Sequence, residues 1–335
     1  MLTLPAFALL LLPQRAEEAP PRHIAWDGLA QRLKQEEAAG FSGAVLVVRY
    51  GQVVLDPGYG LANRETGVRC TSETIFGIGS TPIDFTRAGI LLLIEAGQLA
   101  FDATVGELFP QAPEEKRAIT IAQLMSGRSG LPDFHDLPSD RDKDHAWIDR
   151  DEAVRRILAQ ELLFRPGQGE EHSHSAWGLL AAVIELVSGE TYPEFTRKNL
   201  FEPAGMKDTG FFGAPIPAER LAIGYGLRHD GETNAPPYWG PTSWLVMGSG
   251  GQTSTTRDME RWLTGLRTQK ILGEEMTRRY FGPDDGGPLV GGDMYGFYIC
   301  YTTRAKARMI LISNSAAPGK YRGLAEDLAR LVNGR

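Results

Sequence analysis

Cysteine is scarce in this chain, which has only Cys70 and Cys300 among its 335 residues. Two cysteines this far apart in the sequence do not have the spacing of a metal-binding motif. The sequence leaves open whether they pair in an exported protein or remain two buried thiols. There is also no apolar run of 18 residues or more, so no integral membrane segment is expected. Basic clusters are missing and the formal net charge is −7, so nucleic acid is not an expected partner.

What the chain does contain is a hydrophobic content of 42%, enough for one large domain or two closely packed ones. Residues 1–13 are apolar and similar to the hydrophobic region of a secretory signal, although no basic residues precede them. We therefore predict a leader and linker over residues 1–22 and export to the periplasm or the extracellular space. A misassigned start codon or a short disordered leader is the alternative interpretation.

The chemistry of the sequence centres on Ser80, which stands between a β-prone segment and a long apolar helix. Thr81 can cap this helix, and Pro82 suits its first position because a missing N–H costs nothing there. Asp84 follows Thr81 by three residues and completes an approximate capping box. A serine placed here faces unpaired backbone N–H groups and the positive end of the helix dipole. The arrangement suits an oxyanion, but it is also an ordinary way to begin a helix.

Motifs around Ser80 occur in an order and spacing similar to those of the penicillin-binding-protein-like serine hydrolases, which include class C β-lactamases, D-aminopeptidases and esterases. They are Phe85-Thr86, Glu95-Ala96-Gly97-Gln98-Leu99, Asp102, Ser129-Gly130-Leu131-Pro132, Pro166-Gly167, Leu200-Phe201-Glu202-Pro203 and Gly248-Ser249-Gly250-Gly251. The resemblance extends over about residues 41–330. No G-x-S-x-G elbow is present, which disfavours an α/β-hydrolase.

The resemblance implies an α/β fold of the β-lactamase/transpeptidase type. An antiparallel sheet flanked by helices is formed by both chain ends, and a mostly helical domain is inserted between them. We predict one β-lactamase-related domain over residues 23–335. Its α/β part comprises residues 23–79 and about 236–335, and its helical part comprises residues 80–235.

Three positions depart from the family pattern, and each departure removes a group that handles protons. Ile83 stands where the family has the lysine of Ser-x-x-Lys, and isoleucine cannot accept the proton of the serine. The family's Tyr-x-Asn motif reads His172-Ser173-His174. The usual basic residue before Gly296-Phe297 is missing, because Gly291-Gly292-Asp293 stands there.

Candidate catalytic residues are Ser80, His172 and His174. His172 replaces the tyrosine with a group that titrates near neutrality, so it is the predicted base for Ser80. Glu170 or Glu171 is predicted to orient either ring. The N–H of Ser80 and a backbone N–H near Met294, in the segment with Gly292 and Asp293, form the oxyanion site that the resemblance implies.

Other interpretations of these residues stay open. His172 and His174 can be loop residues beside a helix capped through Ser173 and Ser175, or ligands of a metal ion if a further ligand is nearby. Ser80 can be a small residue that fits a tight helix entry. His135 and His229 are interpreted as loop residues, and Asp136 to Asp151 as a charged surface segment.

The predicted function is that of a diverged serine hydrolase that cleaves an ester or amide through an acyl-enzyme on Ser80. The partner is then a small-molecule or peptide substrate, and no cofactor is expected. The alternative is a pseudoenzyme that binds a peptide or cell-wall-like ligand in the same cleft. β-Lactamase activity is not expected, because the residues that activate the deacylating water in the family are missing.

Overall fold

The computed structural model describes residues 24–140, 144, 146–226, 234–283, 290–304, 306–315 and 321–332. The predicted leader at residues 1–22 lies outside the described residues, as does His229.

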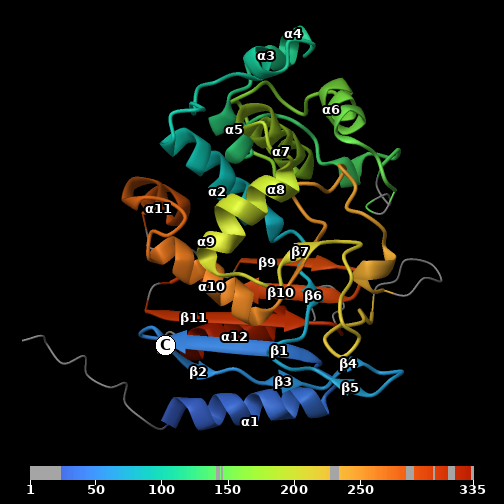
Figure 1. Cartoon of the computed structure of the whole chain (residues 1–335), viewed down its shortest axis with the longest axis vertical. Coiled ribbons are helices and arrows are strands. Elements are labelled where there is room, and N and C mark those ends of the chain that lie inside the picture. Colours follow the sequence, from blue (N-terminus) through green and yellow to red (C-terminus); the bar gives the residue numbers. More distant parts are fainter. Residues whose placement is uncertain are drawn as a thin grey trace, which may run out of the picture.

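The largest sheet has six antiparallel strands and joins the two ends of the described chain (Figure 1). Its order is β2-β1-β11-β10-β9, and β3 also pairs with β1. Along the whole length of β1, Gly43 to Arg49 pair with Ser313 to Ala307 of β11. This sheet is the one predicted from the sequence. The bounds are β1 (Gly43–Arg49), β2 (Gln52–Leu55), β3 (Gly58–Tyr59), β9 (Val290–Met294), β10 (Phe297–Tyr301) and β11 (Ala307–Ser313).

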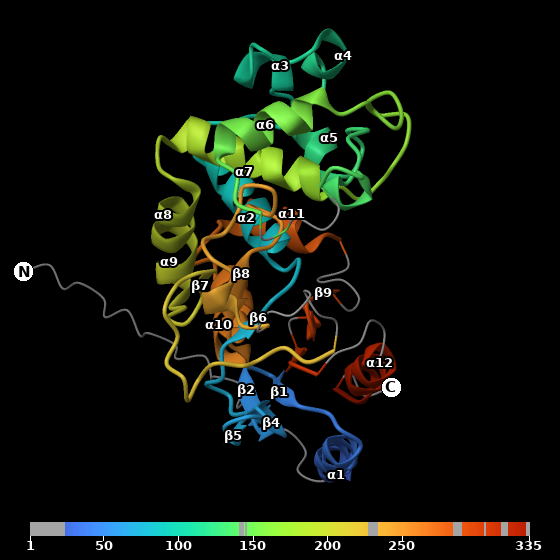
Figure 2. The same cartoon turned by 90° about the vertical axis from the view of Figure 1, so that its right-hand side faces the viewer.

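The two central strands, β1 and β11, are mostly apolar because both faces of the sheet are covered. Successive side chains of a strand point to opposite faces. Val45 and Met309 accordingly pack with α1 (Ile24–Ala38) and α12 (Arg322–Val332), whereas Leu46 and Ile310 join the larger core on the other side. Figure 2 shows α1 and α12 at the end of the molecule opposite to the helical part.

The helical part is built around the contact between α2 and α7, whose apolar residues form one core. Gly89 of α2 makes this contact close, because a Cβ there would lie 2.8 Å from Ile184 Cδ1 of α7. The bounds are α2 (Pro82–Glu95), α3 (Val105–Leu108), α4 (Glu114–Arg117), α5 (Ile121–Met125), η1 (Phe134–Asp136), α6 (Arg150–Ala159), α7 (His174–Ser188), α8 (Tyr192–Thr196), η2 (Arg197–Phe201) and α9 (Glu202–Ala204).

A smaller three-stranded sheet connects the two parts. The first of its strands leads directly to Ser80, and the order is β6-β8-β7. The remaining elements are β4 (Leu61–Asn63), β5 (Val68–Arg69), β6 (Phe76–Gly77), β7 (Gly210–Phe211), η3 (Pro236–Tyr238), β8 (Gln252–Ser254), α10 (Thr256–Arg267) and α11 (Glu274–Phe281).

The packing does not change at the predicted boundary near residue 235. Leu200, Phe201, Met206 and Phe212 all belong to the core on the sheet side. Part of the segment assigned to the helical part therefore supports the sheet, and the domain limits remain a prediction.

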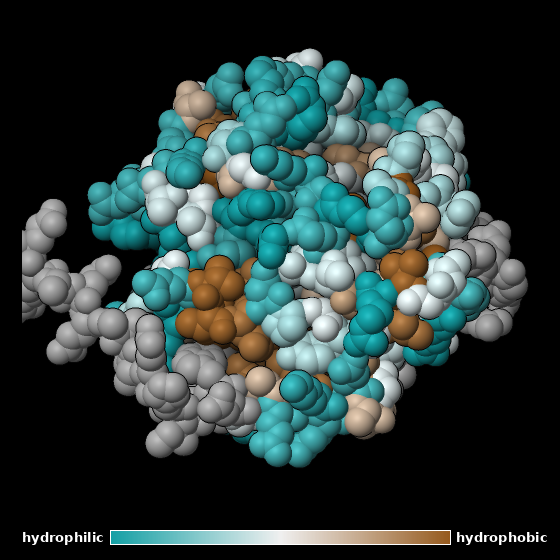
Figure 3. All heavy atoms as spheres, turned by 60° about the horizontal axis from the view of Figure 1, so that its bottom comes forward, coloured by the Kyte–Doolittle hydropathy of each residue, from teal (hydrophilic) through white to brown (hydrophobic). Residues whose placement is uncertain are grey.

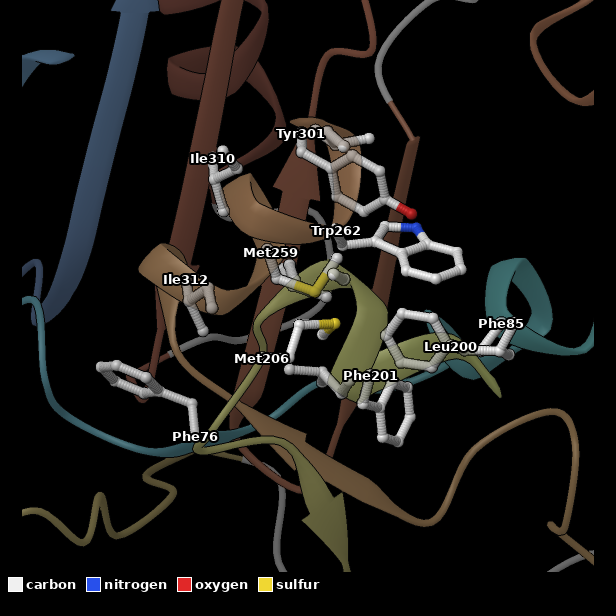
Figure 4. Close-up of a cluster of buried hydrophobic side chains, with 14 of the residues drawn as sticks. Phe76, Phe85, Leu200, Phe201, Met206, Met259, Trp262, Tyr301, Ile310 and Ile312 are labelled. Carbon is white, nitrogen blue, oxygen red and sulfur yellow. The ribbon is translucent and has the colours of Figure 1, made fainter. Parts of the chain in front are cut away.

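Aromatic side chains fix the first turns of α2 against the sheet side of the molecule (Figure 4). The rings of Phe85 and Trp262 meet edge to face at 4.8 Å, and Phe85 meets Phe201 in the same way at 5.1 Å. A polar contact also joins α2 to the sheet, because the Tyr301 hydroxyl donates a hydrogen bond to the carboxylate of Asp84. The helix that begins beside Ser80 is therefore held on the side of the larger core.

The predicted capping box is wrong. Thr81 has helical backbone angles, φ −56° and ψ −32°, whereas a capping residue needs an extended backbone to turn its oxygen toward the helix N–H groups. Its hydroxyl is buried without a hydrogen bond to any residue that the structure describes. Asp84 is directed to Tyr301 and Arg87 instead. Pro82 does occupy the start of the helix as predicted.

The two cysteines are free thiols and both are buried. Cys70 belongs to the larger core, whereas Cys300 belongs to the core under α1 and α12. Burial raises the pKa of Cys70 to about 11 and that of Cys300 to about 12. Of the two interpretations left open by the sequence, the structure has the buried thiols.

No helix in the described ranges is long and apolar enough to span a bilayer. The face shown in Figure 3 is mostly hydrophilic, and its hydrophobic side chains gather in separate areas.

Replacing Trp262 by alanine should lower the free energy of unfolding by about 3–5 kcal/mol, because the side chain is fully buried and its removal leaves a cavity. Urea denaturation followed by circular dichroism measures the change. Tyr238→Ala is the control, because this residue is 71% exposed and should change the same quantity by less than about 0.5 kcal/mol. Equal stabilities of the two variants would contradict the assignment of this core.

Candidate active site

Ser80 lies in the turn between β6 and α2, with its side chain partly exposed. The preceding Gly79 has a φ of +52°, a conformation that glycine adopts without strain. The Ser80 carbonyl accepts a hydrogen bond from the N–H of Ile83 at 3.2 Å. The hydroxyl therefore stands at the N-terminal end of a long helix, as the sequence predicts.

His174 is the side chain that contacts the serine. Its Nε2 lies 3.0 Å from Ser80 Oγ, and it is the first residue of α7. Ser173 caps this helix by accepting a hydrogen bond from Ala176 N–H at 3.1 Å. The same hydroxyl donates to the carbonyl of Pro132 at 3.0 Å, which ties the start of α7 to the loop after α5.

Asp133 follows in that loop and holds His174 from the other side. One oxygen, Oδ2, accepts from His174 Nδ1 at 2.5 Å and from the backbone N–H of His174 at 3.0 Å. An ionised carboxylate only accepts hydrogen bonds, so Nδ1 carries the proton and Nε2 is free to accept from Ser80. Ser80, His174 and Asp133 thus form the hydrogen-bonded line that activates a serine in many hydrolases.

The line continues beyond Asp133. His135 Nδ1 lies 2.8 Å from Asp133 Oδ1, and His135 Nε2 lies 3.0 Å from Asp144 Oδ1. The hydroxyl of Tyr295, from the turn between β9 and β10, donates to Asp144 Oδ2 at 3.1 Å. The site therefore alternates acidic and basic groups between the helical part and the edge of the sheet.

Hydrogen bonds decide the charges of this array. Burial favours the neutral form of Asp133, but the bonds from His135 and His174 outweigh burial and hold its pKa well below its usual range. Burial also opposes charge on His135, yet its bonds to Asp133 and Asp144 raise its pKa to about 10. At neutral pH Asp133 is an anion and His135 is a cation.

His172, the predicted base, is not the histidine that contacts the serine, because the side-chain hydrogen bond of Ser80 is with His174. It is exposed, and its ring stands perpendicular to that of His174 with the centroids 4.8 Å apart. Partial burial of the ring lowers the pKa of His172, and the neighbouring His174 acts in the same direction. His174, two residues on, reaches Ser80 because it lies inside the first turn of α7 and is fastened by Asp133.

The carboxylate that holds the His174 ring also differs from the two predicted ones. Glu170 and Glu171 are both exposed, and the carboxylate that contacts His174 is Asp133. Ile83, at the position of the family's lysine, is buried in the helical core and offers no acceptor for a proton.

Strand β9 runs past Ser80 at the edge of the sheet. A Cβ on Gly292 would lie 2.6 Å from the backbone nitrogen of Ser80, so only glycine permits this approach. Met294 and Phe297 flank the two-residue turn Tyr295-Gly296 and pair with each other. Such a flanking pair exchanges both of its hydrogen bonds, and the alternation along an antiparallel pair then directs the N–H of Asp293 away from β10. The backbone N–H that this alternation directs outward from the edge is therefore that of Asp293, the residue after Gly292.

A metal ion has a partial set of ligands here. Ligand atoms of Asp133, His172 and His174 lie within 4.8 Å of one another. Both nitrogens of His174 are already engaged, with Ser80 and with Asp133. A metal ion on His174 would have to replace one of these hydrogen bonds, so the geometry favours the hydrogen-bonded line.

Two cavities lie away from the serine. One, of about 820 Å³, is lined by residues of α2 and α11, including Arg87, Arg278 and Tyr280. The other, of about 670 Å³, lies between α6 and the segment that contains α3 and α4. Ser80 and His174 line neither of them.

Asp133 is absent from the predicted site residues, whereas Asp144 falls in the predicted surface segment and His135 in a predicted loop. One signal was present, because Asp133 directly follows Ser129-Gly130-Leu131-Pro132, one of the motifs on which the resemblance rests. Nothing in the sequence indicates that Asp144, nine residues after His135, returns to contact it.

Comparison with known proteins agrees with this architecture. The sequence profile described as Beta-lactamase matches residues 29–333, and the chain belongs to this family. The antiparallel sheet made by both chain ends and the surrounding helices are the fold of its structural relatives, as predicted.

Among the relatives are two proteins of Bacillus subtilis, each 28% identical to this chain. The putative penicillin-binding protein PbpX matches over 260 residues, which cover 78% of this chain and 62% of the relative. Penicillin-binding protein 4* matches over 309 residues, covering 88% and 66%. This chain therefore spans about two thirds or less of the length of these relatives.

Solved structures give the same result. A penicillin-binding protein from Bacillus halodurans is 25% identical, with a TM-score of 0.74, and the match covers 89% of this chain and 99% of that one. A D-amino acid amidase from Ochrobactrum anthropi is 24% identical, with a TM-score of 0.76 and coverage of 93% and 99%. At 24% identity, the second likeness concerns the fold.

Gly292→Ala should reduce covalent labelling of Ser80 by a fluorophosphonate by about 100-fold or more, because the new methyl group would press on the Ser80 N–H that must receive the oxyanion. Intact-mass spectrometry over time measures the rate. Gly28→Ala on α1 is the matched control, because a Cβ there meets no atom within 4 Å. Labelling of Gly292→Ala at the wild-type rate would show that β9 does not border the reacting group.

Proposed function

We propose that this protein is a serine hydrolase that cleaves an ester or amide of a small molecule or peptide through an acyl-enzyme on Ser80. The observation that carries the proposal is the hydrogen-bonded line from Ser80 Oγ to His174 Nε2 and from His174 Nδ1 to Asp133 Oδ2. Membership in the beta-lactamase family supports it. His174, and not His172, is the proposed base.

In the proposed acylation step, His174 Nε2 takes the proton from Ser80 Oγ while Oγ attacks the carbonyl carbon of the substrate. The negative charge that develops on the carbonyl oxygen is received by the backbone N–H groups of Ser80 and Asp293. His174 then gives its proton to the leaving oxygen or nitrogen as that bond breaks. In deacylation, His174 takes a proton from water as the water oxygen attacks the acyl carbon. His174 then returns this proton to Ser80 Oγ as the bond between Oγ and the acyl carbon breaks and the acid product leaves.

Asp133 keeps His174 in the tautomer that this sequence of proton transfers requires. With the proton on Nδ1 fixed by the carboxylate, Nε2 presents a lone pair to the serine hydroxyl. When His174 becomes an imidazolium, the adjacent anion stabilises it. The His174–Asp133 pair thus supplies the function for which the family pattern has lysine and tyrosine.

The alternative function is binding without turnover. The chain has lost the lysine of Ser-x-x-Lys, and relatives carry the name penicillin-binding protein, which favours retention of a peptide or cell-wall-like ligand in a cleft. A protein of this kind should bind such a ligand equally well as wild type and as Ser80→Ala, and it should form no adduct with a fluorophosphonate. The alignment of Ser80 with His174 weighs against it.

A metal-assisted hydrolase at His172 and His174 remains the least favoured interpretation. It would require hydrolysis that is abolished by a chelator and restored by zinc. The proposed serine mechanism instead predicts hydrolysis that is unchanged by the chelator.

Export is proposed on the apolar pattern of residues 1–13. Expression of the full sequence followed by N-terminal sequencing of the product tests this proposal, because an intact Met1 in the cytoplasmic fraction would contradict it.

Incubation with a fluorophosphonate should add one adduct to the wild-type protein and none to Ser80→Ala. His174→Ala should slow the labelling by about 100-fold or more, because the serine loses its proton acceptor. Asp133→Asn should slow it to a similar extent, because the amide favours the wrong tautomer of His174. Intact-mass spectrometry measures the rates.

His172→Ala is the matched control for His174→Ala, because the two rings are neighbours but only one reaches the serine. It should label at close to the wild-type rate. A strong loss in His172→Ala together with normal labelling of His174→Ala would reverse the assignment of the base. Failure of the wild type to form any adduct would favour the binding function.

A further inference from the structure

We infer that His135 and Asp144 are positioning residues for the proposed acyl transfer, which hold Asp133 in place from the side opposite to His174, and that Tyr295 fastens Asp144 from the sheet side of the site. The inference rests on the proposed function and extends the machinery beyond Ser80, His174 and Asp133. It concerns residues that the family motifs do not include.

The geometry singles out His135. Both of its ring nitrogens face carboxylate oxygens, Asp133 Oδ1 at 2.8 Å and Asp144 Oδ1 at 3.0 Å. A histidine between two ionised carboxylates donates from both nitrogens and is therefore a cation. Asp133 also accepts from the backbone N–H of His135 at 3.0 Å. Four hydrogen bonds, two from His135 and two from His174, thus fix one carboxylate.

The His135 ring has little freedom to turn. It stacks on Phe134 with the ring centroids 3.9 Å apart and the planes inclined by 30°. Phe134 is almost fully buried, in a small cluster with Leu245 and Val246, and it meets the His174 ring edge to face at 6.2 Å. One buried phenyl ring therefore supports both imidazoles.

Tyr295 connects this array to the strand that borders the serine. It occupies the turn directly after β9 with a φ of +42°, an unfavourable conformation for a residue with a side chain. The turn lies tightly against the loop that contains Tyr225, because a Cβ on Gly296 would lie 2.6 Å from Tyr225 N. The ring of Tyr295 meets Trp239 at 5.6 Å. The hydroxyl that reaches Asp144 is therefore held on a well-packed turn, two residues after Asp293.

Charge balance explains why a cation belongs at this position. Asp133, His135 and Asp144 together carry one net negative charge when His174 is neutral. When His174 accepts the proton of Ser80, the four groups sum to zero, so the array is neutral as charge develops on the substrate. Without the cation, Asp133 would keep its hydrogen bonds from His174 and Asp144 its bond from Tyr295, but no positive charge would stand between the two partly buried carboxylates. One of them would then tend to take up a proton.

The pH dependence of kcat/KM tests the inference, with p-nitrophenyl acetate as the substrate. His135→Leu should lower kcat with little change in KM and shift the acid limb of the profile to higher pH, by on the order of one unit. The reason is that loss of a cation beside Asp133 and His174 makes the site bind its proton more tightly. The neighbouring titratable groups are Asp133, Asp144, His174, Tyr295 and, beyond His174, His172.

Asp144→Asn should shift the acid limb in the opposite direction, to lower pH, because it removes one negative charge and keeps the shape. Tyr295→Phe, which removes only the hydroxyl, should lower kcat by a smaller factor without a shift comparable to either. Opposite shifts from two variants on the same hydrogen-bonded line distinguish an electrostatic positioning role from simple loss of structure.

His172→Gln is the control, because this ring also neighbours His174, whereas the histidine that is hydrogen-bonded to Asp144 is His135. Its acid limb should stay where the wild type has it. If His135→Leu does not fold, His135→Asn keeps a donor for Asp133 without the charge and should show the same direction of shift with a partial recovery of kcat.

Three outcomes decide the inference. Opposite shifts in His135→Leu and Asp144→Asn support it. A wild-type profile in both variants, with normal activity, would overturn it and leave the proposed function intact. A wild-type protein that neither hydrolyses the ester nor labels at Ser80 would overturn the proposed function and this inference with it.

Discussion

The hydrogen bonds that converge on the Asp133 carboxylate are the constraint on which the rest of the site depends. They join the loop after α5 to the first turn of α7 and determine which nitrogen of His174 faces the serine. The backbone makes this possible, because Ser173 caps α7 and at the same time binds Pro132, the residue before Asp133. The hydroxyl of Ser173, which caps α7, therefore also positions His174 relative to Asp133.

The site combines the fold of the family with a proposed proton acceptor that differs from the family's lysine. The beta-lactamase family fold places Ser80 at the start of α2 and brings the edge strand β9 against it. Ile83 has taken the place of the lysine and completes the helical core instead. In the proposed mechanism, the proton is accepted instead by His174, a histidine in the family's second motif, which contacts Ser80.

How far the sequence predicts this structure depends on the range of each interaction. The antiparallel sheet formed by both chain ends followed from the resemblance, because the motifs keep their order along the chain. The position of Ser80 followed from motif order. The choice between His172 and His174 did not, because it depends on where α7 begins relative to Asp133. The capping box failed for a similar reason, since Asp84 is drawn to Tyr301, which is more than 200 residues away. Asp144 and Tyr295 could not be predicted at all, because their contact joins two loops 151 residues apart.

The close contact of α2 and α7 at Gly89 has a consequence for how precisely the nucleophile meets its base. In a Ser-x-x-Lys helix, serine and lysine stand one turn apart on the same helix, so the helix itself sets their separation. Here the serine lies two residues before the start of α2 and the histidine is the first residue of α7, so the distance between them depends on how the two helices pack. The packing of Ile184 on Gly89 therefore affects the reactivity of Ser80 in the proposed mechanism as well as the stability of the protein. In this chain, residues deep in the helical core thus influence the proposed reaction through the distance between Ser80 and His174, without contacting the substrate.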